Sequence, residues 1–178
     1  MASFTLTVGR VVCLSIVMLT LSGGCGAPSE PERPRPGTLV VDHDRWTPRM
    51  SSPQFGAADP GCTARGYGVE PAGFEINTDL CDGVTFEQAL ALDLPAGTRL
   101  YLSGWHGDLW APQPGHGRLV VAIGGEVLAE LSSPIPARAA AQSWEITLER
   151  PALAGEIIAL HVRNHGANQW TLGRVEVL

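Results

Sequence analysis

The residues best suited to binding chemistry lie in one short segment, 105–110 (WHGDLW). The indole faces of Trp105 and Trp110 could stack on the C–H face of a sugar ring, while His106 and Asp108 could hydrogen-bond its hydroxyl groups. The segment therefore predicts a carbohydrate site. The alternative is structural: two tryptophans can cap the end of a β-sandwich, and His106 shares the strand parity of buried leucines.

A second polar group lies between residues 161 and 170 and consists of His161, Asn164, His165, Asn168 and Trp170. Two histidines four residues apart would face one side of a helix as metal ligands, but this stretch has the pattern of a strand followed by a turn. Strand parity predicts that His161 points outward and that Trp170 belongs to the core. His165 and Asn168 are candidates to join the 105–110 segment in one site, and a purely structural turn is the alternative.

Oxygen-bearing side chains gather around Cys81, at Asn77, Asp79 and Asp82. Calcium takes six to eight oxygen ligands in flexible geometry, so these three residues predict a structural calcium site and no other cofactor. Asx-turns explain the same residues without an ion.

Enzyme signatures are missing: the sequence has no GxSxG, HExxH, P-loop or dinucleotide-binding pattern. We therefore expect a non-catalytic protein. Five histidines and several aspartates leave a metal-dependent hydrolase as an alternative.

The charge pattern excludes some partners. The 178-residue chain has a net charge of −6, and its twelve basic residues are all scattered arginines without interleaved aromatics. That distribution argues against nucleic-acid binding and against electrostatic attachment to anionic lipid.

The elements that must position these residues are short strands. Twenty-one glycines and fourteen prolines separate stretches in which apolar and polar residues alternate. The expected strands, eight or nine in number, are 39–41, 74–77, 86–94, 99–105, 119–123, 127–131, 144–148, 158–162 and 170–177. Residues 44–71 are expected to be irregular.

Turn residues suggest how the strands pair. Residues 95–97 (PAG) are expected to join 86–94 and 99–105 as partner strands, and Gly124-Gly125 predicts a tight hairpin. Gly173 predicts a bulge in the last strand. The fold class is all-β, a two-sheet antiparallel sandwich over residues 38–178, with a small closed barrel as the alternative.

The C-terminal stretch SWEITLERPALAGEIIALHVRNHGANQWTLGRVEVL resembles the closing strands of galactose-binding-like jelly-roll domains. Together, INTDLCDG, WHGDLWAP and NHGANQW also resemble a group of bacterial lipoproteins of unknown function. The resemblance covers residues 74–178. It implies a jelly roll whose end loops bind saccharides or other envelope ligands, often beside a structural calcium ion, but it maps no binding residue onto this chain.

The amino terminus has the layout of a secretory signal. Arg10 precedes an apolar run, 11–21, which is too short to span a bilayer and ends at LSGGC. This resembles a bacterial lipobox, although Leu21 lies four residues before the cysteine rather than three. We expect signal segment 1–24 to be removed and Cys25 to be acylated, for example with palmitate, and to anchor the protein to a membrane of the bacterial cell envelope, periplasm-facing or at the cell surface. Ordinary signal-peptidase cleavage is the alternative.

Residues 25–37, which include GAPSEPERPRPG, then form a proline-rich tether. Cys62 and Cys81 would remain as an even pair in an oxidising compartment, which predicts a disulfide. A metal pair is the alternative, but the two cysteines lack CxxC spacing.

Two non-enzymatic functions compete. In the first, the domain binds carbohydrate through Trp105, His106, Asp108 and Trp110. In the second, it is an accessory subunit that contacts another envelope protein, and the aromatics are packing residues.

Overall fold

The computed structural model describes residues 33–178. The predicted signal segment 1–24, the predicted lipidation site Cys25 and the tether up to residue 32 lie outside the described residues. No helix in the described part is long and apolar enough to cross a membrane.

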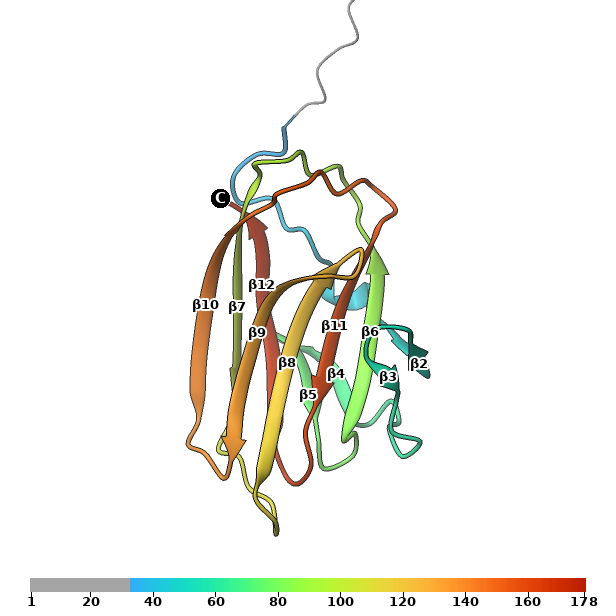
Figure 1. Cartoon of the computed structure of the whole chain (residues 1–178), viewed down its shortest axis with the longest axis vertical. Helices are drawn as coiled ribbons and strands as arrows, with labels where there is room; N and C mark the ends of the chain where they lie inside the picture. Colours follow the sequence, from blue (N-terminus) through green and yellow to red (C-terminus); the bar gives the residue numbers. More distant parts are fainter. Residues whose placement is uncertain (1–32) are drawn as a thin grey trace, which may run out of the picture. The chain divides into compact units, whose positions relative to one another are not determined.

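Two five-stranded antiparallel sheets pack face to face and confirm the predicted sandwich (Figure 1). Sheet I has the order β1-β6-β11-β8-β9, with bounds Thr47–Arg49, Gly83–Ala89, Ile157–Arg163, Gly115–Ile123 and Glu126–Ile135. Sheet II has the order β10-β7-β12-β5-β4, with bounds Ala140–Thr147, Arg99–His106, Gln169–Val177, Gly73–Asn77 and Tyr67–Glu70. From β5 onward every connection except the β8–β9 hairpin passes from one sheet to the other, as in a jelly roll.

The core forms between the sheets because apolar side chains alternate along the strands. On β7, Leu100 and Leu102 are fully buried, whereas Tyr101 and Ser103 point outward. Trp170 on β12 is fully buried, as its parity predicted. A disulfide joins Cys62 to Cys81 and confirms the predicted pairing.

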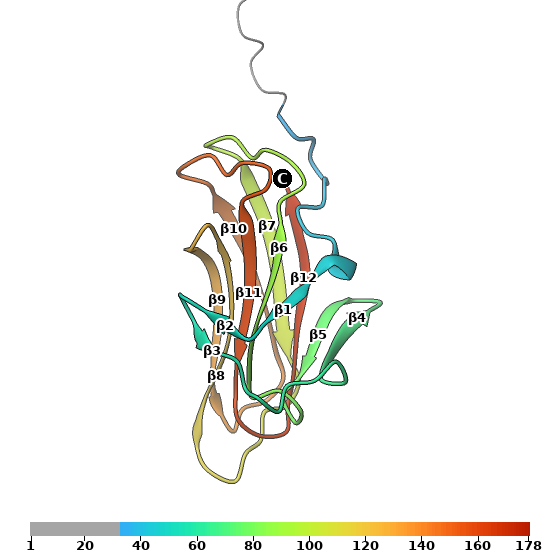
Figure 2. The same ribbon diagram turned by 90° about the vertical axis from the view of Figure 1, so that its right-hand side faces the viewer.

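The outer face of sheet I is covered, and this corrects the expected exposure of His161. The side chain does point away from the sandwich, opposite Thr85 on β6, but it is only 3% exposed. A small hairpin of β2 (Ser51–Ser52) and β3 (Gly56–Ala57) lies over this face (Figure 2), and Phe55 stacks on the imidazole with 4.5 Å between ring centroids. Gln54 Nε2 donates to the Gly125 carbonyl at 2.9 Å and ties the hairpin down.

The expected pairing of 86–94 with 99–105 is wrong. The first stretch forms β6 in sheet I and the second forms β7 in sheet II, so residues 90–98 cross between the sheets. The Gly124-Gly125 hairpin is confirmed, with both glycines at positive φ, and so is the bulge at Gly173.

Residues 44–71 are less irregular than their composition suggests, because they include β1 to β4 and the 3₁₀ turn η1 (His43–Arg45). Residues 39–41 were expected to form a strand, but there Leu39 makes a single bridge to Glu176. Gly37 N donates to the Val177 carbonyl at 2.7 Å, so the described chain enters at the end of the sandwich where β12 finishes. The β7–β8 loop (107–114) and the β11–β12 loop (164–168) lie at the opposite end (Figure 1).

Candidate functional site

His106 is a core residue, so it cannot contact a ligand at the surface. It is 2% exposed, and its Nε2 hydrogen-bonds with the hydroxyl of Ser133 at 2.7 Å. Its ring also packs on Trp170, with 4.7 Å between centroids. The structural alternative considered for this histidine therefore holds.

Asp108 joins two loops at the end of the sandwich. Its carboxylate accepts from the Ala139 backbone N–H at 2.8 Å and from Arg138 Nη1 at 3.2 Å. The Ala139 hydrogen bond, helped by Arg138, holds the pKa of Asp108 below its ordinary value. The side chain remains exposed, but its oxygens already have donors.

Trp110, His165 and Asn168 lie close together in the end loops. Trp110 is 60% exposed, and the buried Asn168 holds its backbone at both polar groups: Trp110 N donates to Asn168 Oδ1 at 2.6 Å, and Asn168 Nδ2 donates to the Trp110 carbonyl at 3.4 Å. His165 Nε2 donates to the Gln113 carbonyl at 3.1 Å and braces the same loop. The result is an indole presented on a loop that its neighbours hold in place.

The predicted calcium ligands lie in turns, where Asn77 takes part through its side-chain oxygen and Asp79 and Asp82 through their backbone N–H groups. Asn77 Oδ1 accepts from Asp79 N at 2.9 Å, which is an Asx-turn, and Asp82 N donates to Asp59 Oδ2 at 3.1 Å. Across residues 33–178 there is no group of three or more His, Cys, Asp or Glu side chains that could hold a metal ion.

Trp105 stands on the outer face of sheet II, one residue before the end of β7. The strand register places it between Ala141 on β10 and Thr171 on β12, with Glu75 on β5 beyond Thr171. Because the side chains of Ala141 and Thr171 are small, the half-buried indole is accessible from the outside. A Cβ at Gly173 would collide with the indole, so the glycine bulge makes room for it.

Tyr101 points to the same side four residues earlier on β7. It lies between Glu145 on β10 and Glu176 on β12, and Arg99 Nη2 pairs with Glu145 at 2.7 Å. At about 3.3 Å per residue, the Cα atoms of Tyr101 and Trp105 are about 13 Å apart. This open face therefore carries two half-buried aromatic rings framed by carboxylates and hydroxyls.

The two outer faces of the sandwich differ sharply. On sheet I, the β2–β3 hairpin buries Thr85 and His161. On sheet II, the non-glycine side chains that point outward are at least partly exposed, apart from Thr171. In Figure 2 the β2–β3 hairpin lies on the side of sheet I, not of sheet II.

Tyr101, Thr171 and Glu75 were not among the predicted ligand residues. Alternation along 99–105 does place Tyr101 and Trp105 on one face, opposite the buried leucines. What the sequence could not supply was the register of β10, β12 and β5 beside them, because those strands come from distant parts of the chain.

Comparison with protein-family models and with curated proteins finds no match. Among solved structures the chain is similar to the C-terminal CBM6 of LamC, a marine laminarinase from Zobellia galactanivorans (13% identity, 76% of this chain and 96% of that one, TM-score 0.42). It is also similar to a CBM4 (14%, 80% and 96%, 0.44) and to TmCBM61 in complex with β-1,4-galactotriose (14%, 79% and 98%, 0.39). Likeness at these identities and TM-scores says nothing of what this chain binds.

Proposed function

We propose that this protein is an exported, lipid-anchored, non-catalytic module that binds carbohydrate on the open face of sheet II. The observation that carries the proposal is the pair Tyr101 and Trp105, two aromatic rings on one strand of a sheet face that is left uncovered.

Sugar recognition needs an aromatic surface for the C–H face of the ring and polar groups for its hydroxyls. Trp105 supplies the first between the small residues Ala141 and Thr171. Glu75 and Glu176 supply carboxylates beside the two rings, and neither forms an ion pair with another described residue. A face of this kind suits an extended saccharide that touches both rings.

Binding of soluble β- and α-linked oligosaccharides by isothermal titration calorimetry tests the proposal. Trp105→Ala should weaken binding of the best oligosaccharide at least about tenfold, because the stacking surface is lost. Trp105→Phe should retain part of the affinity. That result would show that the loss of binding in Trp105→Ala does not come from misfolding. Trp110→Ala is the matched control, since that indole stands on the end loop. Equal losses in the Trp105 and Trp110 variants, or no binding of any oligosaccharide, would contradict the proposal.

The Cys62–Cys81 disulfide supports export, because disulfides persist in oxidising compartments. Anchoring rests on the LSGGC pattern at Cys25. Cys25→Ser should move the full-length protein from the membrane fraction to the soluble fraction of cells. A variant that still sediments with membranes would rule out the lipid anchor.

A second candidate function, contact with another envelope protein, has the exposed Trp110 in its favour. Buried Asn168 fixes the loop around this indole, and a fixed exposed tryptophan is a typical centre of a protein interface. Loss of a co-purifying partner in Trp110→Ala, with oligosaccharide binding unchanged, would support this function.

A further inference from the structure

Strand β10 forms one edge of sheet II and pairs with no described strand other than β7 (Figure 1, left). All eight of its residues pair with β7 without a break in register. A strand that is paired on one side only presents a row of free backbone N–H and C=O groups, to which another strand can be added. The edge of β10 is therefore a template for one more strand.

Hydrogen bonds at the two ends of β7 show which residues of β10 face this edge. Gly107 N donates to the Gln169 carbonyl at 3.0 Å. Leu178 N donates to the Arg99 carbonyl at 2.9 Å, so the odd-numbered residues of β7 face β12. The even-numbered residues of β7 then bond their partners on β10, which are also even-numbered. The backbone groups that point to the free edge belong to the odd-numbered residues of β10, which are Ala141, Ser143, Glu145 and Thr147.

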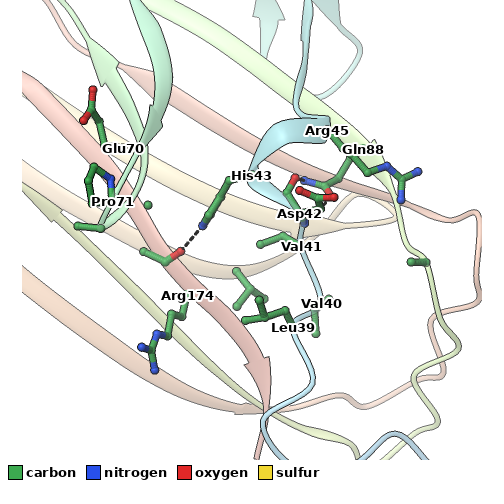
Figure 3. A pocket seen from close by; sticks show the side chains of 15 residues that line it. Leu39, Val40, Val41, Asp42, His43, Arg45, Glu70, Pro71, Gln88 and Arg174 are labelled. Atoms are coloured by element: carbon green, nitrogen blue, oxygen red, sulfur yellow. Dashed lines mark hydrogen bonds between the residues drawn. The ribbon is translucent and has the colours of Figure 1, made fainter.

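The other strand edges in the described sheets are protected. On sheet I, β1 has three residues with Pro48 in the middle, and β9 carries two glutamates, a register shift and Pro134. On sheet II, β4 has four residues and is followed by Pro71. Where β5 ends beside β12, His43 Nε2 donates to the Gly173 carbonyl at 2.7 Å (Figure 3). Short strands, prolines, charges and bulges block edge pairing, and β10 has a single charge and none of the others.

The free edge of β10 is self-complementary. When a second copy of β10 runs antiparallel beside it, the register that pairs all four outward-facing residues is centred on Trp144. This register places Ser143 opposite Glu145 of the second copy, so no two like charges face each other directly. It also places Ala141 opposite Thr147. The four facing pairs would exchange about eight hydrogen bonds.

The inner side of the same edge fits this pairing. Trp144 and Ile146 point into the sandwich but are only half-buried, at the margin of the core. The Trp144 indole lies over Gly104, where a Cβ would be 3.7 Å from the ring. In the register centred on Trp144 the two tryptophans would be directly opposite each other, and the added strand would cover the apolar surface that both side chains leave exposed.

We propose that two copies of this protein pair through β10 and join their second sheets into one continuous antiparallel sheet. The two-fold axis would pass between the two Trp144 residues, so the assembly closes at two copies. The two β7 strands would be three strand spacings, about 14 Å, apart, and the open face would carry Tyr101 and Trp105 twice. The pairing itself does not depend on the proposed carbohydrate site.

Sedimentation equilibrium of the full chain at micromolar concentrations tests the proposal, with Cys25→Ser to remove the predicted lipid attachment. The chain should be a dimer. Ser143→Pro should raise the dissociation constant of the dimer at least about tenfold, because it removes an N–H that faces the free edge and none that bonds to β7. Ser143→Thr is the matched control, since it keeps this N–H and should leave the dimer unchanged.

Two outcomes of this experiment would overturn the proposal. One is a chain that stays monomeric, including a monomer that co-purifies with another polypeptide, and the other is a dimer that Ser143→Pro does not weaken. Neither outcome uses a saccharide, so the proposed function would stand or fall separately. Oligosaccharide binding by single domains should be the same in Ser143→Pro and Ser143→Thr.

Cysteine pairs test the register without a proline. Facing residues of an antiparallel pair have Cα atoms about 5.5 Å apart, which a disulfide can bridge. In a mixture of Ser143→Cys and Glu145→Cys chains, a disulfide should therefore join the two kinds of chain. Ser132→Cys, at an exposed residue on β9, should not cross-link with Glu145→Cys. Equal cross-linking in the two mixtures would overturn the proposal.

Discussion

At the scale of single residues, His161 shows how a covered sheet face changes a side chain's chemistry. Burial lowers the pKa of His161 to about 4, helped by the positive charges of Arg118 and Arg163. Phe55 stacks on the ring, and the Thr85 hydroxyl hydrogen-bonds with its Nδ1 at 3.0 Å. A protonated imidazole would have to lose its hydration in this place.

The free energy of unfolding should therefore fall as the pH falls. Above pH 6.5 His161 is neutral in both states. Between pH 6.5 and about 4 the unfolded chain binds a proton at this histidine and the folded protein does not. The free energy of unfolding therefore falls by about 3 kcal/mol in total over this range. Urea unfolding between pH 4 and 7 measures this dependence. His161→Leu should flatten it, and His116→Gln, at an exposed histidine, should not. A steep dependence that survives in His161→Leu would assign the effect to other groups.

At the scale of elements, prediction succeeded where the information was local. Alternation placed Trp170 and His106 toward the core, and Gly124-Gly125 specified a hairpin that the structure contains. The prediction that β6 pairs with β7 was wrong, because a turn signal at 95–97 is equally compatible with a crossover between sheets. The sequence did not predict the burial of His161, because that burial depends on a hairpin about 100 residues earlier in the chain, which no local pattern reveals.

The β12 bulge offers a test at the same scale. Gly173→Ala would push a methyl group into Ser103 Oγ and the Trp105 ring, so it should cost about 1–3 kcal/mol and weaken oligosaccharide binding by displacing the indole. Gly68→Ala, on β4 of the same sheet, meets no atom within 4 Å and should cost less than about 0.5 kcal/mol. Thermal melts of the two variants make the comparison, and equal effects would contradict the packing described for Trp105.

At the scale of the whole molecule, the disulfide closes a loop that contains β4 and β5 at one edge of sheet II. Cys62 and Cys81 are 19 residues apart, so replacing both with serine should lower the free energy of unfolding by about 3 kcal/mol in the chain-entropy model. Chemical denaturation of the double variant measures the loss. Oligosaccharide binding at low temperature should largely survive, because the stacking residues Tyr101 and Trp105 both lie on β7, outside this loop, and only Glu75 of the proposed site lies within it. A loss of binding by the folded variant would show that the loop also shapes the open face.

The position of β12 in the middle of sheet II has a consequence for how the molecule is made. Its neighbours β7 and β5 lie about 70 and 95 residues earlier, so no nascent chain shorter than residue 177 can complete this sheet. Such non-local pairing makes folding slow. The emerging polypeptide would remain unfolded until nearly all of the domain had been synthesised. A translocation channel that accepts only unfolded chains would then have time to bind it.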